Sequence, residues 1–349
     1  MTPQPPFSDR LLAWWDRNGR KDLPWQHPRT PYRVWISEIM LQQTQVATVI
    51  PYFENWMRTF PDIATLAAGS LDAVLSLWSG LGYYARARNL HKAAQLCKKD
   101  SDGELPAGAK ALSALPGIGL STANAIVSLS TGQPAAVLDG NVRRTLARHG
   151  AIAGWSGKAA VQKSLWKEAE ERLPEKRGAD YTQAIMDLGA MVCTRSSPSC
   201  ELCPVSADCQ ALQQGRVDRF PSPKPPTRVT NKTICMLILR DSENRVLLEK
   251  RPPIGIWGGL WSLPEGGSIK DIEDKLGLTV NNPCRLPPVE HRLSHMRISI
   301  RPVLASAGAA TQVKCKEDQS WFAQKDQPGL GLPKPVSELL KNLGIGEYT

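Results

Sequence analysis

Apolar and polar positions follow a helical period through the first 210 residues of the chain. Between residues 32 and 60 the apolar side chains keep the spacing of an amphipathic helix, about 3.6 residues, at Trp35, Ile39, Val46, Ile50, Phe53 and Met57. We expect Pro51 to interrupt this helix, because proline has no backbone N–H to donate. Further helices are predicted at residues 8–18, 71–77, 85–98, 109–114, 121–129, 141–148, 158–172 and 181–191. The pattern predicts an all-helical part, and its length favours two lobes over one bundle.

A proline-rich segment separates this part from a stretch with a different pattern. Four prolines fall within residues 221–226, a composition typical of an extended, semi-rigid linker. Strand-like runs follow at residues 233–240, 245–249, 261–263 and 297–304, with one short helix expected at 269–276. We therefore expect a helical domain over residues 1–219, a linker over 220–232 and an α+β domain over 233–349.

The 349-residue chain carries 43 basic and 33 acidic residues, a net charge of +10. This balance is compatible with a polyanionic partner, but it does not by itself demonstrate one. The apolar runs are only a few residues long, which excludes a membrane-spanning helix, and we expect no membrane partner. The first ten residues hold three prolines and no apolar core, so they do not form a secretory signal. We expect a cytosolic protein.

Four of the eight cysteines fall close together, at Cys193, Cys200, Cys203 and Cys209. In a cytosolic chain such a cluster indicates metal ligation rather than disulfides. Four thiolates on one loop can bind zinc or a four-iron, four-sulfur cube. Zinc sites usually use paired Cys-x2-Cys motifs and this loop has only one, whereas its wider spacing suits a cube. We expect a mainly structural metal, with a redox role as the alternative.

The stretch Leu115–Gly119 lies between two predicted helices. Gly117 and Gly119 allow a backbone hairpin to approach another chain closely. The N–H groups that open the following helix suit a DNA phosphate, which carries no sequence information. The alternative is an ordinary helix–helix turn.

Two carboxylates are candidates for chemistry. Glu38 shares a mainly apolar helix flank with residues such as Trp35, so its carboxyl should hold a proton more tightly, as a general acid must. The alternative is a partly exposed helical glutamate. Asp139 opens a predicted helix, where it is either an ordinary N-cap or a fixed anion that stabilises positive charge. Both interpretations of Asp139 stay open on this residue alone.

Two further segments are candidates for contacts with bases. The amide-rich stretch at residues 41–45 suits base edges or solvent. The stretch at residues 80–88 offers glycine-framed aromatic side chains and two arginines, which can enter a base stack or pack in a core.

Together these motifs resemble the MutY family of adenine DNA glycosylases, within the helix-hairpin-helix DNA glycosylase superfamily. The closest matches are residues 35–46, 81–92 and 186–195, together with the cysteine loop at 193–209. The resemblance extends over essentially the whole chain. It implies an all-α helix-hairpin-helix glycosylase domain with an iron–sulfur loop, followed by an α+β Nudix-like domain, in a bacterial protein that acts on the nucleoid.

The resemblance also implies a reaction and a set of residues. It implies hydrolytic removal of adenine mispaired with 8-oxoguanine or guanine in duplex DNA, by a monomer with one [4Fe-4S] cluster on the four cysteines. Glu38 matches the acid that protonates adenine at N7, Asp139 the carboxylate that stabilises the cationic sugar, and Asn141 a partner of the site. Residues expected to probe the base pair or contact DNA are Gln43, Thr44, Tyr83, Arg86, Gly117, Gly119, Ser121, Arg143 and Arg195.

The chain departs from its relatives at several points. Ser121 stands where strand-nicking relatives carry a lysine, which predicts a monofunctional enzyme that leaves an abasic site. Leu293, Ser294 and His295 stand for a Phe-Ser-His element that recognises 8-oxoguanine, so the preference for this lesion should be weaker. Arg195 is the only basic residue between the first two cysteines, which predicts a weaker phosphate contact there.

Three other functions are weighed against this one. The first is an endonuclease III-like lyase on oxidised pyrimidines, which Ser121 and the second domain disfavour. The second is a non-enzymatic iron–sulfur protein that binds DNA or senses redox state. The third is a Nudix phosphohydrolase, disfavoured because no Arg-Glu-x-x-Glu-Glu string follows Gly267 and Glu273.

Overall fold

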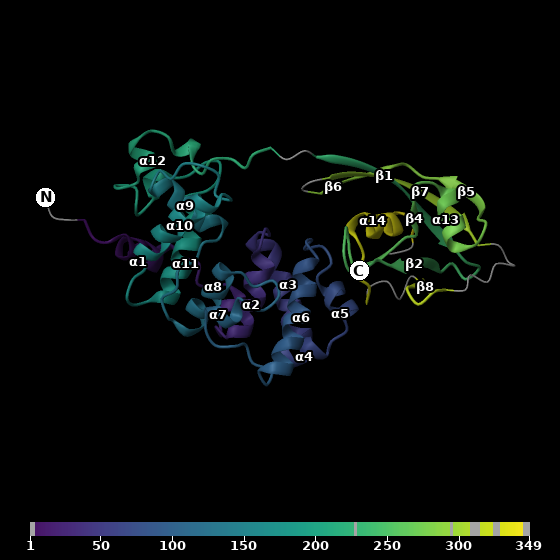
Figure 1. Cartoon of the computed structure of the whole chain (residues 1–349), viewed down its shortest axis with the longest axis horizontal. Coiled ribbons are helices and arrows are strands. Elements are labelled where there is room, and N and C mark those ends of the chain that lie inside the picture. Colours follow the sequence, from purple (N-terminus) through teal and green to yellow (C-terminus); the bar gives the residue numbers. More distant parts are fainter. Residues whose placement is uncertain (1–3, 227–228, 294–295, 308–314, 324–328, 345–349) are drawn as a thin grey trace. The chain divides into compact units, whose positions relative to one another are not determined.

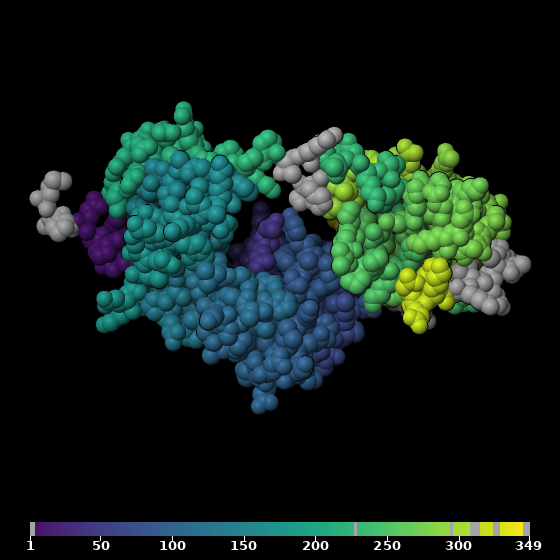
Figure 2. All heavy atoms as spheres, viewed as in Figure 1, coloured from purple at the N-terminus to yellow at the C-terminus, as the bar shows by residue number. Residues whose placement is uncertain are grey.

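The computed structural model describes residues 4–226, 229–293, 296–307, 315–323 and 329–344. The chain divides into two compact units, the first made of Met1–Ala68 and Asn89–Pro225 and the second of Gly69–Arg88 and Pro226–Thr349. The segment Gly69–Arg88 therefore groups with the second unit, although the sequence analysis assigns it to the helical domain. Figure 1 shows the helices and strands of the chain, and Figure 2 shows all heavy atoms as spheres in the same view. No helix within the described ranges is long and apolar enough to cross a membrane.

The first unit is helical. Its elements are α1 (Phe7–Asn18), α2 (Pro31–Leu41), α3 (Val46–Thr59), α4 (Ile63–Ala68), most of α6 (Ala85–Asp100), α7 (Ala109–Leu112), α8 (Leu120–Thr131), α9 (Gly140–His149), α10 (Ala159–Glu171), α11 (Gly178–Asp187) and α12 (Gln210–Gln213), with short 3-10 or π turns between some of them. α2 and α11 both pack against α8, and fully buried side chains such as Trp35 and Trp56 form the core. The predicted helices are confirmed to within a few residues at their ends.

The predicted interruption at Pro51 is wrong. The chain leaves the helix earlier, between α2 and α3, where Gln43 adopts a positive φ of 60°. Pro51 lies inside α3, where it removes one backbone hydrogen bond to the preceding turn. The apolar face of α3 buries Phe53 and Trp56, and this burial offsets the lost bond.

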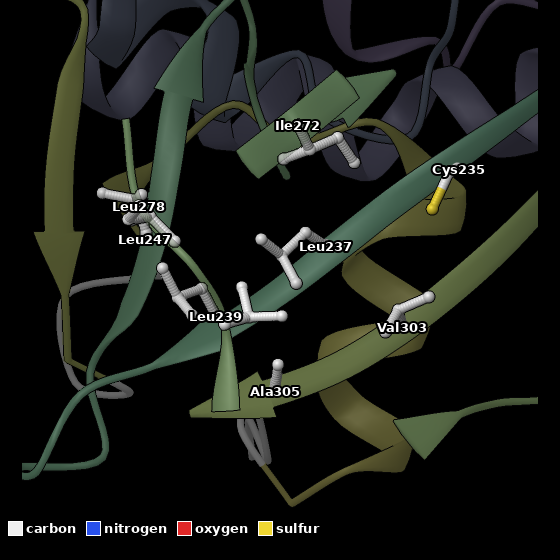
Figure 3. Packing of buried hydrophobic residues seen from close by; sticks show 9 residues of the cluster. Cys235, Leu237, Leu239, Leu247, Ile272, Leu278, Val303 and Ala305 are labelled. Carbon is white, nitrogen blue, oxygen red and sulfur yellow. The ribbon is translucent and has the colours of Figure 1, made fainter. Parts of the chain in front are cut away.

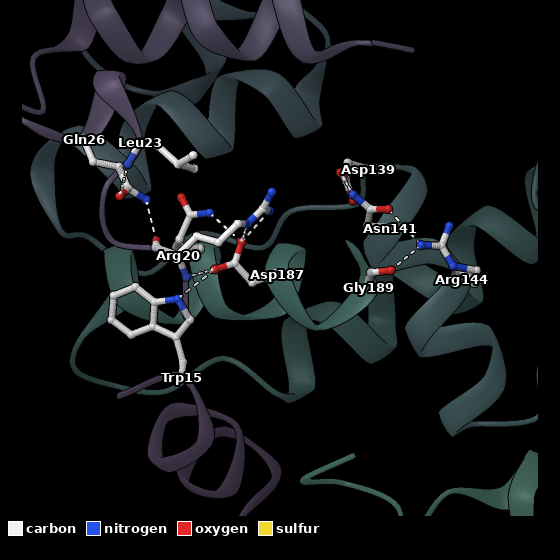
Figure 4. Close-up of polar contacts among 10 residues, drawn as sticks. Trp15, Arg20, Leu23, Gln26, Asp139, Asn141, Arg144, Asp187 and Gly189 are labelled. Carbon is white, nitrogen blue, oxygen red and sulfur yellow. Dashed lines mark hydrogen bonds and ion pairs between the residues drawn. The ribbon is translucent and has the colours of Figure 1, made fainter. Parts of the chain in front are cut away.

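A buried carboxylate ties the N-terminal segment to α11. Asp187 is fully buried and accepts hydrogen bonds from Trp15 Nε1 at 3.1 Å and from Gln183 Nε2 at 2.9 Å. The backbone N–H and the guanidinium of Arg20 also donate to it, at 2.6–2.9 Å (Figure 4). A buried carboxylate is stable only with such donors, so this network fixes the end of α11 that leads into the candidate site.

The second unit contains α5 (Leu71–Leu77), one sheet and two helices. The sheet strands are β1 (Thr230–Arg240), β2 (Val246–Lys250), β3 (Trp261–Ser262), β4 (Glu265–Gly266), β5 (Asn281–Arg285), β6 (Val289–Leu293), β7 (Met296–Ser306) and β8 (Gln319–Phe322). The central order is β3-β2-β1-β7-β5, while β4, β6 and β8 pair with β1, β7 and β2. The pair β1–β7 is parallel.

Helix α13 (Ile269–Leu276) begins at a capping box between Ser268 and Asp271 and has the bounds that the sequence predicts. It places Ile272 in an apolar cluster with Leu237 and Val303 (Figure 3). The second helix, α14 (Lys334–Asn342), and the strands β4, β5, β6 and β8 were not predicted from the sequence.

Candidate active site

Glu38 lies on α2, whose N-terminus is capped by the Thr30 hydroxyl, which accepts from Arg33 N at 3.3 Å. Its helix neighbours Val34, Trp35 and Ile39 are buried, while the Glu38 side chain keeps part of its surface exposed. Burial, followed by the negative charge of Asp139, raises the pKa of Glu38 to about 8. The expected proton-holding carboxyl is therefore present, and a carboxyl with this pKa is protonated near neutral pH.

Asp139 is the N-cap of α9. Its Oδ1 accepts a 2.7 Å hydrogen bond from the N–H of Val142, and its Oδ2 lies 3.5 Å from Nδ2 of Asn141. Burial raises the pKa of Asp139, whereas backbone N–H groups and the positive charges of Arg144 and Arg143 oppose the rise. The cap fixes the carboxylate in one orientation, and its charge acts on Glu38. The structure confirms the capping interpretation of Asp139, whereas the stabilisation of positive charge stays a prediction.

Asn141 is held from the side opposite Asp139. Arg144 Nη2 donates to Asn141 Oδ1 at 2.8 Å and also to the carbonyl oxygen of Gly189 (Figure 4). A methyl group at Gly189 would lie 2.7 Å from Asn141 Cβ and 2.9 Å from its backbone carbon. Only glycine therefore permits this approach of the π-helical turn Leu188–Val192 to α9.

Ser121 contacts the segment that carries Asp139. Its Oγ accepts a hydrogen bond from the Leu138 N–H at 2.8 Å. A second contact holds the same segment, because Asn124 Nδ2 donates to the Ala136 carbonyl at 2.6 Å. The side chain at position 121 therefore points toward the chain just before the candidate catalytic aspartate.

The predicted hairpin joins α7 to α8. Gly117 has a φ of +80°, and a Cβ there would lie 2.8 Å from Asn89 Cβ, so both its conformation and its close packing require glycine. Gly119 is the N-cap of α8 and has no heavy atom near the position of a Cβ. The first N–H groups of α8 have no partner within the helix, as an anion-binding turn requires.

The amide-rich segment forms the turn between α2 and α3. Gln43 is exposed and Thr44 half-buried. Gln42 Nε2 lies 3.5 Å from Thr122 Oγ1 on α8, which links this turn to the start of the helix after the hairpin. Gln43 thus projects from a backbone that is anchored on both sides.

Tyr83 lies in the second unit, on the loop before α6. It has a φ of 48° and is 50% exposed. Arg86 supports this loop from beneath: its guanidinium stacks between the rings of Trp78 and Tyr83 and donates to the carbonyls of Leu81 and Gly82. Arg86 is itself buried, so its side chain supports the exposed tyrosine and has little surface left for DNA.

The remaining predicted contacts are spread over both units. Arg143 is half-buried on α9, and Arg195 is exposed on the cysteine loop. Leu293 is half-buried and ends β6, opposite Met296 of β7. Ser294 and His295 lie outside the described residues.

The four clustered cysteines line one cavity, together with Thr145 and Arg148 of α9. Burial raises the pKa of the thiols of Cys200, Cys203 and Cys209, that of Cys203 to about 12, and the negative charges of neighbouring thiolates add to the rise. Thiolates gathered in this way are stable with a cationic centre between them. The donor set therefore fits a metal cluster.

Arg148 holds the cysteine loop from inside the first unit. It is 3% exposed, and its guanidinium donates to the carbonyls of Thr194 at 2.6 Å, Arg195 at 3.0 Å and Phe220 at 2.9 Å. Its Nη1 lies 3.4 Å from Cys193 Sγ. One buried arginine thus joins α9 to both ends of the segment that carries the cysteines.

Known proteins with the same arrangement identify the family. A model described as "HhH-GPD superfamily base excision DNA repair protein" matches residues 36–171. A protein of Buchnera aphidicola subsp. Schizaphis graminum named "Adenine DNA glycosylase" is 37% identical over 341 residues, which cover 96% of this chain and 98% of that protein. The chain belongs to the adenine DNA glycosylases. It is accordingly a DNA N-glycosylase of base-excision repair. A human relative of the same name is 32% identical over 386 residues, which cover 92% of this chain and 70% of that protein.

Solved structures confirm the fold class of this adenine DNA glycosylase. A thermostable thymine-DNA glycosylase matches 60% of this chain and 95% of its own, with 27% identity and a TM-score of 0.53. A non-covalent endonuclease III–DNA complex shares the fold, with a TM-score of 0.51 and 22% identity over 60% of this chain and 94% of its own. A NUDIX domain model matches residues 235–342, which confirms the predicted Nudix-like part.

Sequence reasoning missed three residues of this glycosylase's site. Arg144 follows Asn141 by three positions on one helix, a spacing that places the two side chains together. Arg148 follows Arg144 by four positions and lies on the same helix face for the same reason. No local signal marks Gly189, because its role depends on a contact with a helix that begins 49 residues earlier.

Proposed function

We propose that the chain hydrolyses the N-glycosidic bond of adenine paired with 8-oxoguanine or guanine in duplex DNA. The products are free adenine and an abasic site on an unbroken strand. The observation that carries the proposal is the pairing of a glutamate whose pKa lies near 8 with a fixed, helix-capping aspartate in one unit. The mispair lowers the cost of extruding adenine from the stack.

Glu38 is proposed as the general acid. Adenine leaves poorly as an anion, so N7 takes the Glu38 proton while the N9–C1′ bond breaks and its electron pair goes to the base. Water then adds to C1′, and its proton returns to the Glu38 carboxylate. The carboxyl must be neutral before the reaction, as its raised pKa provides.

Asp139 is proposed as the stabiliser of the sugar. Positive charge develops on the sugar as the bond to adenine breaks, and a carboxylate already fixed beside it stabilises this transition state more than the ground state. Asn141 keeps Asp139 in place through the 3.5 Å contact, and Arg144 keeps Asn141 in place.

The product is proposed to be an abasic site because position 121 bears a serine. A lyase needs an amine that forms a Schiff base with the opened sugar. The Ser121 hydroxyl accepts from the backbone beside Asp139, so the position faces the site but supplies no amine.

Recognition is proposed to involve both parts of the chain, as a monomer. In the helical domain, residues 1–219, Gln43, Thr44, Arg143, Arg195, Ser121 and the Gly117–Gly119 hairpin contact the DNA, and Tyr83 with Arg86 beneath it probes the base pair. In the domain at residues 233–349, Leu293, Ser294 and His295 read the base opposite adenine. The exposure of Gln43, Tyr83 and Arg195 supports this assignment.

The cysteine loop is proposed to hold one [4Fe-4S] cluster on Cys193, Cys200, Cys203 and Cys209. Within the described residues no three side chains converge as they would around one ion. The spacing of the four cysteines, with only one Cys-x2-Cys pair, favours the larger cube over a single zinc ion, and the four side chains line one cavity. When bound, the cluster supplies a cationic core that holds the loop against α9. We expect the purified protein to absorb visible light and to contain four iron and four sulfide ions per chain.

The function is tested by single-turnover reaction of a labelled duplex with adenine opposite 8-oxoguanine. One half of each sample is quenched with alkali, and the other half is quenched in the absence of alkali. We expect strand breaks only after alkali, because abasic sites are alkali-labile. Breaks without alkali would mean a lyase, and no breaks in either half would mean a DNA-binding protein without glycosylase activity.

A further inference from the structure

The sheet of the second unit is covered to different extents on its two faces. β1 and β7 run in register from Thr230–Met296 to Arg240–Ser306, so odd-numbered residues of both strands share one face. On this face Leu237 and Val303 pack against Ile272 of α13 (Figure 3). On the even-numbered face, side chains in the first half of both strands are also buried, as at Ile234, Ile298 and Ile300.

The odd-numbered face beyond α13 carries arginines. Arg301 is in register with Cys235, the last member of the apolar cluster, and Arg297 with Asn231. Arg292 of β6 pairs with Arg297, and Arg285 of β5 pairs with Val303, so both point to the same side. All four arginines are exposed. We call Arg285, Arg292, Arg297 and Arg301 the arginine face.

The arginine face keeps an excess of positive charge. Glu290 pairs with Ser299 on this side, and Asp271 of α13 lies near Cys235 with its carboxylate bound to the Ser268 N–H at 2.8 Å. Within the ranges that the structure describes, none of the four arginines has an ion pair or a side-chain hydrogen bond. Four guanidinium groups against two carboxylates leave this end of the sheet basic.

Arg292 and Arg297 stand directly opposite each other on neighbouring antiparallel strands. Like charges in this position destabilise a sheet, because their Cβ atoms are only about 5 Å apart. An anion between the two guanidinium groups removes that repulsion, and arginine binds phosphate in a bidentate manner. The pair is therefore unfavourable in isolation and favourable against a phosphate.

We propose that the arginine face binds backbone phosphates of duplex DNA. The inference rests on the proposed function, which makes duplex DNA the substrate. Arg292 precedes Leu293, and Arg297 follows Met296, so the pair flanks the predicted lesion-recognition segment in the sequence. Phosphate contacts at this pair fix the position of β6 and β7 along the duplex and carry no sequence information. Charge complementarity favours DNA over a partner protein.

The test compares the salt dependence of DNA binding among matched variants of the full chain. The ligand is a duplex with 2′-fluoro-2′-deoxyadenosine opposite 8-oxoguanine, whose fluorine disfavours the cationic sugar and so slows cleavage. Arg292→Ala/Arg297→Ala removes two charges from the arginine face. Lys334→Ala/Lys341→Ala removes two charges from α14 and is the control, since both lysines are exposed. Dissociation constants are measured by fluorescence anisotropy across a series of salt concentrations.

For the arginine variant we expect the slope of log K against log[salt] to become shallower by about 0.9 for each lost phosphate contact. The control should keep the wild-type slope, and Arg292→Lys/Arg297→Lys should keep most of it. The melting temperature of the alanine variant should equal or exceed that of wild type, because the repulsion is gone. The proposal would be overturned if Arg292→Ala/Arg297→Ala had the same slope as Lys334→Ala/Lys341→Ala. Adenine release by the wild type tests the proposed function separately, so the two can fail independently.

Discussion

Arg144 donates a 2.8 Å hydrogen bond from Nη2 to Oδ1 of Asn141, the residue that contacts Asp139. The same guanidinium donates from Nε to the carbonyl oxygen of Cys193 at 2.7 Å. One side chain therefore joins the first cysteine of the loop to the partner of the proposed catalytic carboxylate. We therefore expect disorder in the cysteine loop to weaken the positioning of Asp139, because Arg144 connects the two.

Replacing Arg144 tests this connection. We expect Arg144→Ala to lower the single-turnover excision rate by about 10²-fold, the cost of misplacing a catalytic group by about 1 Å. The affinity for an uncleavable duplex should change little, since the guanidinium is occupied within the protein. Arg177→Ala is the control, because Arg177 is exposed and pairs with Asp16. An excision rate near that of the control would show that Asn141 holds Asp139 without Arg144.

Gly189→Ala tests the packing behind Asn141. The added methyl group meets the Asn141 backbone at 2.9 Å, so α9 or the π-helical turn must shift, and overpacking of this kind costs about 1–3 kcal/mol. We expect a lower melting temperature and slower excision. Gly140→Ala is the control on α9, the helix that carries Asn141, because nothing lies within 4 Å of the new methyl group. Equal melting temperatures for the two variants would contradict the close approach.

The raised pKa of Glu38 predicts how excision depends on pH. Excision should decline as pH rises through about 8, because the acid form is then lost. Glu38→Gln should lose excision at every pH and keep mispair binding, while Glu54→Gln on an exposed position should match wild type. Rates from single-turnover quenches between pH 5 and 9 decide the matter. If Glu38→Gln excised adenine at a rate near that of the wild type, Glu38 would not be the general acid.

The same shift predicts how stability depends on pH. An ordinary glutamate ionises near pH 4.3, whereas Glu38 keeps its proton to about 8 in the folded state. Between these values the folded chain binds more protons than the unfolded chain, so the free energy of unfolding falls as pH rises. Denaturant titrations should therefore show wild type and Glu38→Gln most alike near pH 4, with the wild type losing stability relative to Glu38→Gln as pH rises toward 8. If the difference between their free energies of unfolding did not change with pH, the pKa of Glu38 would be ordinary in the folded state.

Arg148 is expected to determine how firmly the cysteine loop keeps its metal. Arg148→Met removes the donor to Cys193 Sγ and to buried carbonyls such as that of Thr194, and loss of such a supporting group typically costs about 10–100-fold in metal affinity. We expect faster iron release to a chelator, followed by absorbance. Arg195→Ala is the control, because Arg195 accepts from Arg148 through its backbone carbonyl, which the substitution keeps. Equal release rates would show that the thiolates suffice.

Local patterns in the sequence determined the secondary structure and most of the chemical groups. The helices at Leu71–Leu77 and Ile269–Leu276 have the predicted bounds, because apolar spacing and end signals are local. The apolar flank of Glu38, the capping position of Asp139 and the four clustered cysteines are also visible within short stretches. The strand β5, Asn281–Arg285, escaped prediction because it is exposed throughout and shows no alternation of apolar and polar residues.

How these groups act on one another depends on the folded chain. The pKa of Glu38 depends on burial by the folded chain and on Asp139, about a hundred residues away. The break after α2 falls at Gln43 rather than Pro51, because packing on both sides outweighs the preference of a single residue. Gly189 and the pairing of Arg292 with Arg297 likewise become visible only when distant segments meet. Local sequence therefore defines which chemical groups are available, and the fold sets their neighbours, because desolvation, charge and close contact arise between residues that are far apart in the chain.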